Sequence, residues 1–397
     1  MDKFYISSEV LGTERHMEVS SEGFSTVSRV PPDSWLLGVS PRNSGNPCLN
    51  SLFRLGGSEL RVLPPEPDVT AMSIVAPDGP RPWAQVMPPT RYKTFVKNLI
   101  KSIVGNMDAM PKEYCRVTWM ACGSLLDRLR PAKIDTVAFK AASEAGNPSL
   151  ESFRPGGGGY AQPVVYDRFS TRTGRLTVAS GPNILTLKKD HRRLLRSHFP
   201  DGCVVSLDFS ALEARIVLLE AGVVPAIGDI YTQISNELFS GRIPRDAVKV
   251  AVLSELYGAS RSSLAHKLDM PSAEVDKFVD AMRGYFRTPE LRCRLTDEVR
   301  KTGKILNKFG RPLTMEDASS DHLFVNTYAQ STGVDVSLLG FKKVVDDLGS
   351  DGIRPLFVLH DALILDVRGD RLADVEAVKS TSVPGYSSNF PLKFEAV

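Results

Sequence analysis

The stretch CVVSLDFSALEARI, residues 203–216, decides how this chain is interpreted. The apolar run CVVSL predicts a buried strand, and SALEARI begins a helical pattern that runs on to Gly222. Asp208 stands between the two. A strand that ends in an acid before a helix places the carboxylate at the edge of a sheet, where ligands bind in α/β architectures. An aspartate here could equally serve as the N-cap of the helix, so the stretch alone leaves both interpretations open.

A second acid gives Asp208 a partner. Asp361 lies in VLHDALILDV, residues 358–367, in a tight turn between two short apolar runs that we expect to be buried strands. A turn aspartate commonly has no further role. However, one or two carboxylates together with substrate phosphates are the usual ligands of Mg²⁺. Two such ions can activate an attacking hydroxyl and stabilise a leaving pyrophosphate. The pair therefore predicts a two-magnesium site, with Mn²⁺ as a substitute metal.

Between the acids lies a helix with a cationic stripe, RDAVKVAVLSELYG at 245–258. Four residues spaced by four share one face: Arg245, Lys249, Leu253 and Tyr257. An ordinary amphipathic surface would show the same stripe. As a working face, the arginine fork suits outer phosphates and the lysine suits the bond that breaks. The tyrosine could stack on a base or template.

Composition restricts the class of protein. The chain has 397 residues, enough for two or three lobes, and its 42% hydrophobic and 24% charged content is ordinary for a soluble enzyme. The net charge is only +3, so nucleic-acid binding would have to use local basic faces. Five scattered cysteines without a CxxC pair argue against a disulfide framework or a zinc site. No stretch resembles a signal peptide or a membrane span, so we expect an intracellular, cytoplasmic protein with no membrane partner.

One such basic face precedes the acids. In RYKTFVKNLIKSIVG, residues 91–105, apolar residues recur every four positions and predict an amphipathic helix. Three lysines recur on another face: Lys93, Lys97 and Lys101. Taken alone, this is best interpreted as a solvated face. The later motifs favour a face that lies along a phosphate backbone.

The motifs together resemble DNA polymerase family A, the family of bacterial DNA polymerase I and related phage enzymes. DFSALEARI resembles the family's DYSQIELRI, the helix at 245–258 resembles RxxxKxxxFxxxYG, and VLHDALILDV resembles VHDE followed by a strand. TGRL at 173–176 and NTYAQSTGVD at 326–335 resemble, in the same order, family segments that contact primer and template. The resemblance extends from about residue 166 to 397.

The resemblance implies an α+β fold shaped like a right hand. The palm would be an antiparallel sheet with helices on one face, and the fingers and thumb would be helical. The expected domains are an N-terminal region of unknown role at 1–85, a thumb-like region at 86–160, palm at 161–228, fingers at 229–320 and palm again at 321–397.

It also implies a role for single residues. Asp208 and Asp361 would be the catalytic metal ligands, and Lys249 would be catalytic as a proton donor to pyrophosphate. The dNTP would be bound by Arg245, Lys249, Leu253, Tyr257, Glu213 and Tyr231, with Glu213 excluding a 2′-hydroxyl. Primer–template DNA would be bound by Arg175, Asn326, Gln330 and His360, and the lysines at 93, 97 and 101 would add a basic face.

Four positions depart from the family pattern, and one of them is His322, which stands where the family often has an arginine. Ala362 replaces the acid that follows the second aspartate, Leu253 replaces an aromatic residue, and Tyr231 replaces a histidine. We therefore expect a divergent member that keeps its activity. The early acids Glu66 and Asp68 lie among prolines, which predicts no 3′–5′ exonuclease.

We therefore predict a monomeric, template-directed DNA polymerase. Its expected partners are primer–template DNA and dNTPs, with replication accessory proteins as further partners. Two alternatives stay open. A single-subunit RNA polymerase has a similar palm and helix, although Glu213 argues against it. The second alternative is a polymerase homologue that has lost catalysis and only binds nucleic acid. The departures from the family pattern motivate this alternative.

Overall fold

The structure is a computed structural model that describes residues 3–20, 22–38, 47–60, 70, 74, 84, 87–144, 148–258, 260–315, 321 and 323–397. The chain divides into two compact units, Met1–Met120 and Ala121–Val397. Their boundary falls inside the range predicted as thumb, and the five-domain division stays a prediction. Glu66, Asp68 and His322 lie outside the described residues.

The first unit contains a small sheet of order β3-β2-β1-β4, in which β1 pairs parallel with β4 and antiparallel with β2. Its strands are β1 (Phe4–Ile6), β2 (His16–Ser20), β3 (Gly23–Val27) and β4 (Trp35–Leu37). Its helices are α1 (Ser8–Leu11), α2 (Leu49–Leu55), α5 (Pro89–Asn106), η1 (Met107–Ala109), α6 (Lys112–Tyr114) and the π-helix η2 (Cys115–Trp119).

Helix α5 confirms the predicted amphipathic helix. It buries Val96, Leu99 and Ile103, while Phe95 is only half-buried. The three lysines at 93, 97 and 101 are exposed. The hydroxyl of Tyr92 donates to the carbonyl of Leu11 at 3.0 Å and fastens the start of α5 to the end of α1.

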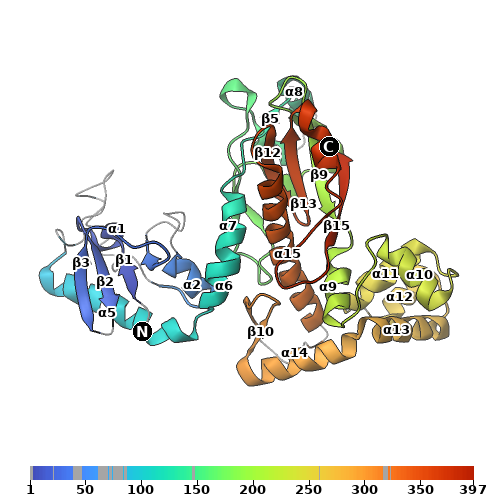
Figure 1. The fold of residues 1–397 in the computed structure, drawn as a ribbon, viewed down its shortest axis with the longest axis horizontal. Helices are drawn as coiled ribbons and strands as arrows, with labels where there is room; N and C mark the ends of the chain where they lie inside the picture. Colours follow the sequence, from blue (N-terminus) through green and yellow to red (C-terminus); the bar gives the residue numbers. More distant parts are fainter. Residues whose placement is uncertain are drawn as a thin grey trace. The chain divides into compact units, whose positions relative to one another are not determined.

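The second unit is built on a five-stranded antiparallel sheet of order β12-β13-β9-β15-β14 (Figure 1). The strands are β9 (Cys203–Phe209), β12 (Ile353–Leu359), β13 (Ala362–Val367), β14 (Ser380–Thr381) and β15 (Phe390–Ala396). The middle position of β9, with covered faces on both sides, explains why CVVSL is continuously apolar.

Both faces of this sheet are covered. The helices α9 (Leu212–Glu220) and α15 (Phe324–Leu348) pack against the face that carries Leu207 and Phe209, and α15 runs along it in Figure 1. The opposite face, with Val204 and Ile364, packs against a segment between residues 132 and 195. The expectation of helices on one face alone is therefore only partly right: the long helices α9 and α15 cover one face, and shorter helices and loops cover the other.

The helices and strands in that covering segment and around it are short, because turns separate them. They are α7 (Met120–Leu126), β5 (Lys133–Ile134), α8 (Thr136–Glu144), η3 (Pro148–Phe153), η4 (Gly157–Gly159), β6 (Val165–Asp167), β7 (Thr177–Ser180), η5 (Ile184–Thr186), η6 (Lys189–Leu194) and β8 (Leu195–Arg196). Near the C-terminus follow η8 (Gly369–Arg371) and α16 (Leu372–Glu376).

A helical subdomain corresponds to the range predicted as fingers. It comprises α10 (Ile230–Phe239), α11 (Arg245–Leu256), α12 (Arg261–Leu268), α13 (Ser272–Phe286), α14 (Thr288–Thr302) and the hairpin β10 (Lys304–Leu306) and β11 (Pro312–Thr314). These helices share a core that includes Val248, Val252 and Phe278. Helix α11 ends at Leu256 with Tyr257 as its C-cap, and Gly258 follows with φ 69°, a left-handed conformation that favours glycine. None of the described helices is long and apolar enough to span a membrane.

Candidate active site

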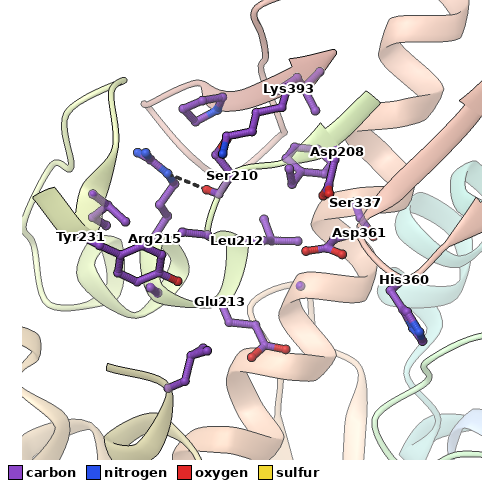
Figure 2. Close-up of a pocket in the computed structure, with 18 of the residues that line it drawn as sticks. Asp208, Ser210, Leu212, Glu213, Arg215, Tyr231, Ser337, His360, Asp361 and Lys393 are labelled. Atoms are coloured by element: carbon purple, nitrogen blue, oxygen red, sulfur yellow. Dashed lines mark hydrogen bonds between the residues drawn. The ribbon is translucent and has the colours of Figure 1, made fainter. Parts of the chain in front are cut away.

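The two predicted acids come together at one end of the sheet. Asp208 is the penultimate residue of β9 and lies opposite Ala362, the first residue of β13. Asp361 precedes Ala362, and its carbonyl accepts a hydrogen bond of 2.9 Å from the backbone N–H of Phe209. Both carboxylates line a pocket of about 720 Å³ (Figure 2). The structure thus brings these two acids, which are distant in the sequence, into one pocket, and their role as metal ligands stays a prediction.

Burial and mutual repulsion control the electrostatics of the pair. Desolvation, followed by the charges of Asp361 and Glu395, raises the pKa of Asp208 to about 7, while Lys393 and Arg192 oppose the rise. Burial also raises the pKa of Asp361. Ionising both carboxylates side by side is costly in the absence of metal, and a divalent cation bound between them makes the ionised state of both favourable.

The donor set fits a hard divalent cation. Carboxylate oxygens are the preferred ligands of Mg²⁺, which usually takes one or two of them and completes its shell with water and substrate phosphates. Within the described ranges no group of three or more His, Cys, Asp or Glu side chains could hold a metal by itself. Asp208 and Asp361 would thus supply two carboxylates to a metal, and any remaining ligands would come from water and substrate.

Two of the six described non-glycine residues with positive φ lie at this end of the sheet. His360, in the hairpin turn, and Ala211, at the start of α9, have φ values of 54° and 53°. Non-glycine residues in this left-handed region cost about 1 kcal/mol each, and such strain is commonly found at functional sites. Figure 2 shows His360 beside Asp361. The hairpin therefore holds His360 in a position that favours glycine, and packing against β9 must compensate.

The predicted cationic stripe faces the acids. Four α11 residues line the pocket: Arg245, Lys249, Leu253 and the C-cap residue Tyr257. Arg245 is already held, because Asp229 accepts from its Nε at 2.9 Å and its Nη2 at 2.7 Å, and Asp246 accepts from its Nη1 at 2.8 Å. The pairing with Asp229 was not predicted from the sequence. Lys249 is exposed and forms no side-chain hydrogen bond or ion pair with any described residue.

Glu213, in α9, connects Arg175 to the C-cap residue of α11. Its two oxygens accept from Arg175 Nη2 at 2.9 Å and from the hydroxyl of Tyr257 at 2.7 Å. Tyr231 lies beneath Arg245, whose guanidinium carbon is 5.4 Å from the ring centre, and burial raises the pKa of Tyr231 to about 12. The phenol therefore stays protonated at neutral pH and can donate a hydrogen bond into the pocket.

Arg215 is a residue of the site that sequence reasoning missed. It is only 2% exposed and donates to three carbonyls, those of Ser210 at 2.8 Å, Ala226 at 2.6 Å and Gly228 at 2.6 Å. Figure 2 shows its bond to Ser210. It thereby ties the turn after Asp208 to the segment that leads into α10. The available signal was the single basic residue of a largely apolar helix, which indicates an internal partner.

The predicted DNA-binding residues do not all lie at the pocket. Arg175, Gln330 and His360 line the pocket. Asn326 is not among the lining residues, but its Oδ1 accepts from Gln330 Nε2 at 2.7 Å one turn along α15. The three lysines of α5 belong to the first unit, so the structure does not relate them to this pocket.

The sheet and the helices around this pocket form the palm and fingers fold of a polymerase. The chain belongs to DNA polymerase family A, whose family model matches residues 164–396. Among curated relatives, the thermostable DNA polymerase I of Thermus thermophilus is 26% identical over 261 residues, which cover 58% of this chain and 31% of that protein. The DNA polymerase I of Deinococcus radiodurans is 25% identical over 246 residues, covering 54% and 25%.

This chain thus spans about a third or less of the length of these relatives. Among solved structures, the polymerase domain of Pol1 from M. smegmatis, in complex with DNA primer-template and dNTP, is similar with a TM-score of 0.59. The match covers 99% of this chain and 94% of that chain at 13% sequence identity, and it shows the fold alone.

Proposed function

We propose that this protein is a template-directed DNA polymerase that adds dNTPs to a primer 3′-hydroxyl. The observation that carries the proposal is the shared pocket, in which Asp208 and Asp361 face the fingers helix with Arg245 and Lys249. Membership of DNA polymerase family A supports it. A site of paired acids opposite paired cations suits a substrate that carries both a polyphosphate and divalent metal.

In the proposed reaction the primer 3′-hydroxyl gives its proton to water, its oxygen forms a bond to the α-phosphorus, and the bond from that phosphorus to the bridging oxygen of the β-phosphate breaks. Pyrophosphate leaves with the electron pair. Asp208 and Asp361 would hold two Mg²⁺ ions, which when bound would activate the hydroxyl and stabilise the leaving group. Arg245 and Lys249 would bind the outer phosphates, and Lys249 would donate a proton to the pyrophosphate.

Glu213 supports deoxyribonucleotides as the substrate class. Its carboxylate is fixed between Arg175 and Tyr257 by the two hydrogen bonds given above, so it cannot easily turn away from a sugar. A fixed acidic side chain would exclude a 2′-hydroxyl, which argues against a single-subunit RNA polymerase. Arg175, Gln330 and His360 would then contact primer and template at the same pocket, with Asn326 supporting Gln330.

Primer extension tests the proposal. Wild-type protein with a labelled primer, template, dNTPs and Mg²⁺ should extend the primer, while Asp208→Asn and Asp361→Asn should each lose at least about 10³-fold in rate. Asp347→Asn is the matched control, because Asp347 is an exposed partner of Lys343 on α15 and should leave the rate unchanged. Extension that is absent in the wild type, or unaffected by either pocket substitution, would contradict the proposal and favour a homologue that only binds nucleic acid.

The same assay separates the finer predictions. Substituting rNTPs for dNTPs should reduce extension strongly. A primer with a mismatched 3′ end should remain untrimmed when no nucleotide is present, because we propose that this chain lacks 3′–5′ proofreading. Trimming of that end by purified protein would contradict this prediction.

A further inference from the structure

Two lysines near the C-terminus line the active-site pocket from the β15 side. Lys393 lies on β15 directly opposite Asp208 on β9. Lys379 is its neighbour, since the carbonyl of Lys379 accepts a hydrogen bond of 2.8 Å from the backbone N–H of Leu392. Both lysines are exposed. Neither makes a side-chain hydrogen bond or ion pair with any residue that the structure describes.

These lysines differ from the arginines of the pocket, whose guanidinium groups are already engaged. Arg175 binds Glu213, Arg245 binds Asp229, and Arg215 binds backbone carbonyls. Among the described lysines and arginines that line the pocket, only lysines keep an unpaired charge, namely Lys249, Lys379 and Lys393. A free cation in a concave site attracts an anionic ligand without first having to exchange a partner.

The order of the strands places the two lysines away from the metal side of the site. Strand β9 lies between β13 and β15, so Asp361 and Lys393 lie on opposite sides of Asp208. In Figure 2 the side chain of Lys393 extends toward Ser210, in the turn that follows Asp208. A nucleotide whose α-phosphate lies at the acids could therefore extend its outer phosphates toward this turn and meet the lysines.

A lysine next to a cation-binding carboxylate needs an explanation, because it repels the metal ions that the acids attract. Ala362, directly opposite Asp208 on the other neighbouring strand, contributes no compensating negative charge. Glu395, two residues beyond Lys393, already pairs with Lys189 at 3.0 Å. A polyphosphate brings several negative charges of its own, so it is a ligand that two unpaired lysines beside a metal site would attract.

We propose that Lys379 and Lys393 form a second polyphosphate-binding wall, on the palm, opposite the Arg245 and Lys249 wall of the fingers. The pair binds the outer phosphates of the incoming nucleotide and then the pyrophosphate product. This inference rests on the proposed polymerase function, because that function supplies the ligand. It assigns to the β14–β15 segment a role in holding phosphates that does not depend on the nucleotide base.

The test measures binding of inorganic tripolyphosphate to the full chain in EDTA by titration calorimetry, with neither metal nor catalysis required. The double variant Lys379→Ala/Lys393→Ala should bind about tenfold more weakly than wild type, equivalent to about 1.4 kcal/mol. Lys393→Arg in the presence of Lys379 should bind as wild type. The matched control is Lys277→Ala, an exposed lysine of α13 outside the pocket, which should have no effect.

A second arm distinguishes nucleotide phosphates from a nucleic-acid backbone. Fluorescence anisotropy of a labelled primer–template should give the same Kd for wild type and the double variant. Unchanged tripolyphosphate binding by the double variant overturns the inference, and so does a loss confined to primer–template. Because tripolyphosphate binding needs no turnover, its outcome is independent of primer extension. Failure of the wild type to extend primers would count against the proposed function alone.

Discussion

Replacing Arg215 by leucine is the substitution for which the structure gives the clearest expectation. The arginine is buried and donates to three backbone carbonyls, so Arg215→Leu leaves three buried acceptors without their donors. A single unsatisfied buried acceptor costs about 1–3 kcal/mol. Local relaxation and removal of a buried charge offset part of the sum, so the free energy of unfolding of the second unit should fall by about 3–5 kcal/mol.

The distribution of tryptophan makes this effect measurable within one chain. The three tryptophans, at positions 35, 83 and 119, all precede Ala121, so their fluorescence reports on the first unit. In urea unfolding, Arg215→Leu should move the transition followed by far-UV circular dichroism to lower denaturant, and the tryptophan transition reports separately on the first unit. Arg193→Leu, an exposed arginine, is the matched control and should move neither transition.

The same substitution should slow catalysis. Arg215 fixes the Ser210 turn beside Asp208 and the segment that ends at Asp229, so its loss displaces groups on both sides of the pocket. Small displacements of this kind cost about 10²-fold in rate. Arg215→Lys can reach fewer of the three carbonyls and should fall between wild type and leucine. If Arg215→Leu unfolds at the wild-type urea concentration and extends primers within twofold of wild type, the positioning role is wrong.

Three further predictions concern the carboxylates around the pocket. Glu213→Ala should improve incorporation of rNTPs relative to dNTPs by about tenfold or more, because it removes the group that we propose excludes a 2′-hydroxyl; an unchanged ratio in steady-state kinetics would disprove the assignment. Asp229→Asn keeps the cap on α10 but removes the charge that holds Arg245. Because the released arginine can then bind phosphate without first exchanging a partner, KM for dNTPs should fall about threefold to tenfold. A rise in KM would show instead that Asp229 positions the arginine. Asp208→Asn should abolish extension and yet stabilise the metal-free protein. The folded state raises the pKa of this acid from 3.8 to about 7, so it binds more protons than the unfolded state between these values, and stability falls as pH rises through that window. After allowance for solvent screening, we expect a gain of about 1–2 kcal/mol in EDTA at pH 8 and less at pH 5; equal effects at both pH values would contradict the proposed origin of the pKa shift.

The sequence was sufficient for the elements whose pattern is local. The apolar run before Asp208 and the runs on both sides of Asp361 predicted strands that the structure confirms. The four-residue spacing from Arg245 to Tyr257 predicted one helix face, and that face lines the pocket. Here a single periodicity determines both the element and the direction of its side chains.

The sequence was insufficient where the partner is a backbone atom or depends on strand register. The three acceptors of Arg215 are carbonyls, which every residue has, so no sequence letter marks them. The pairing of Lys393 with Asp208 joins positions 185 residues apart, and only the register of β15 against β9 reveals it. The contact of Asp229 with Arg245 needed the relative placement of two helices. Long-range pairing of this kind is fixed by packing and not by local pattern.

Binding of Mn²⁺, followed by electron paramagnetic resonance, examines the pair of acids most directly. With a saturating dNTP present, wild type should bind two Mn²⁺ ions per chain, and Asp361→Asn should bind at least about tenfold more weakly while its far-UV spectrum is unchanged. Mn²⁺ binding that is the same in both proteins would mean that Asp208 and Asp361, although adjacent in the fold, do not form a metal site.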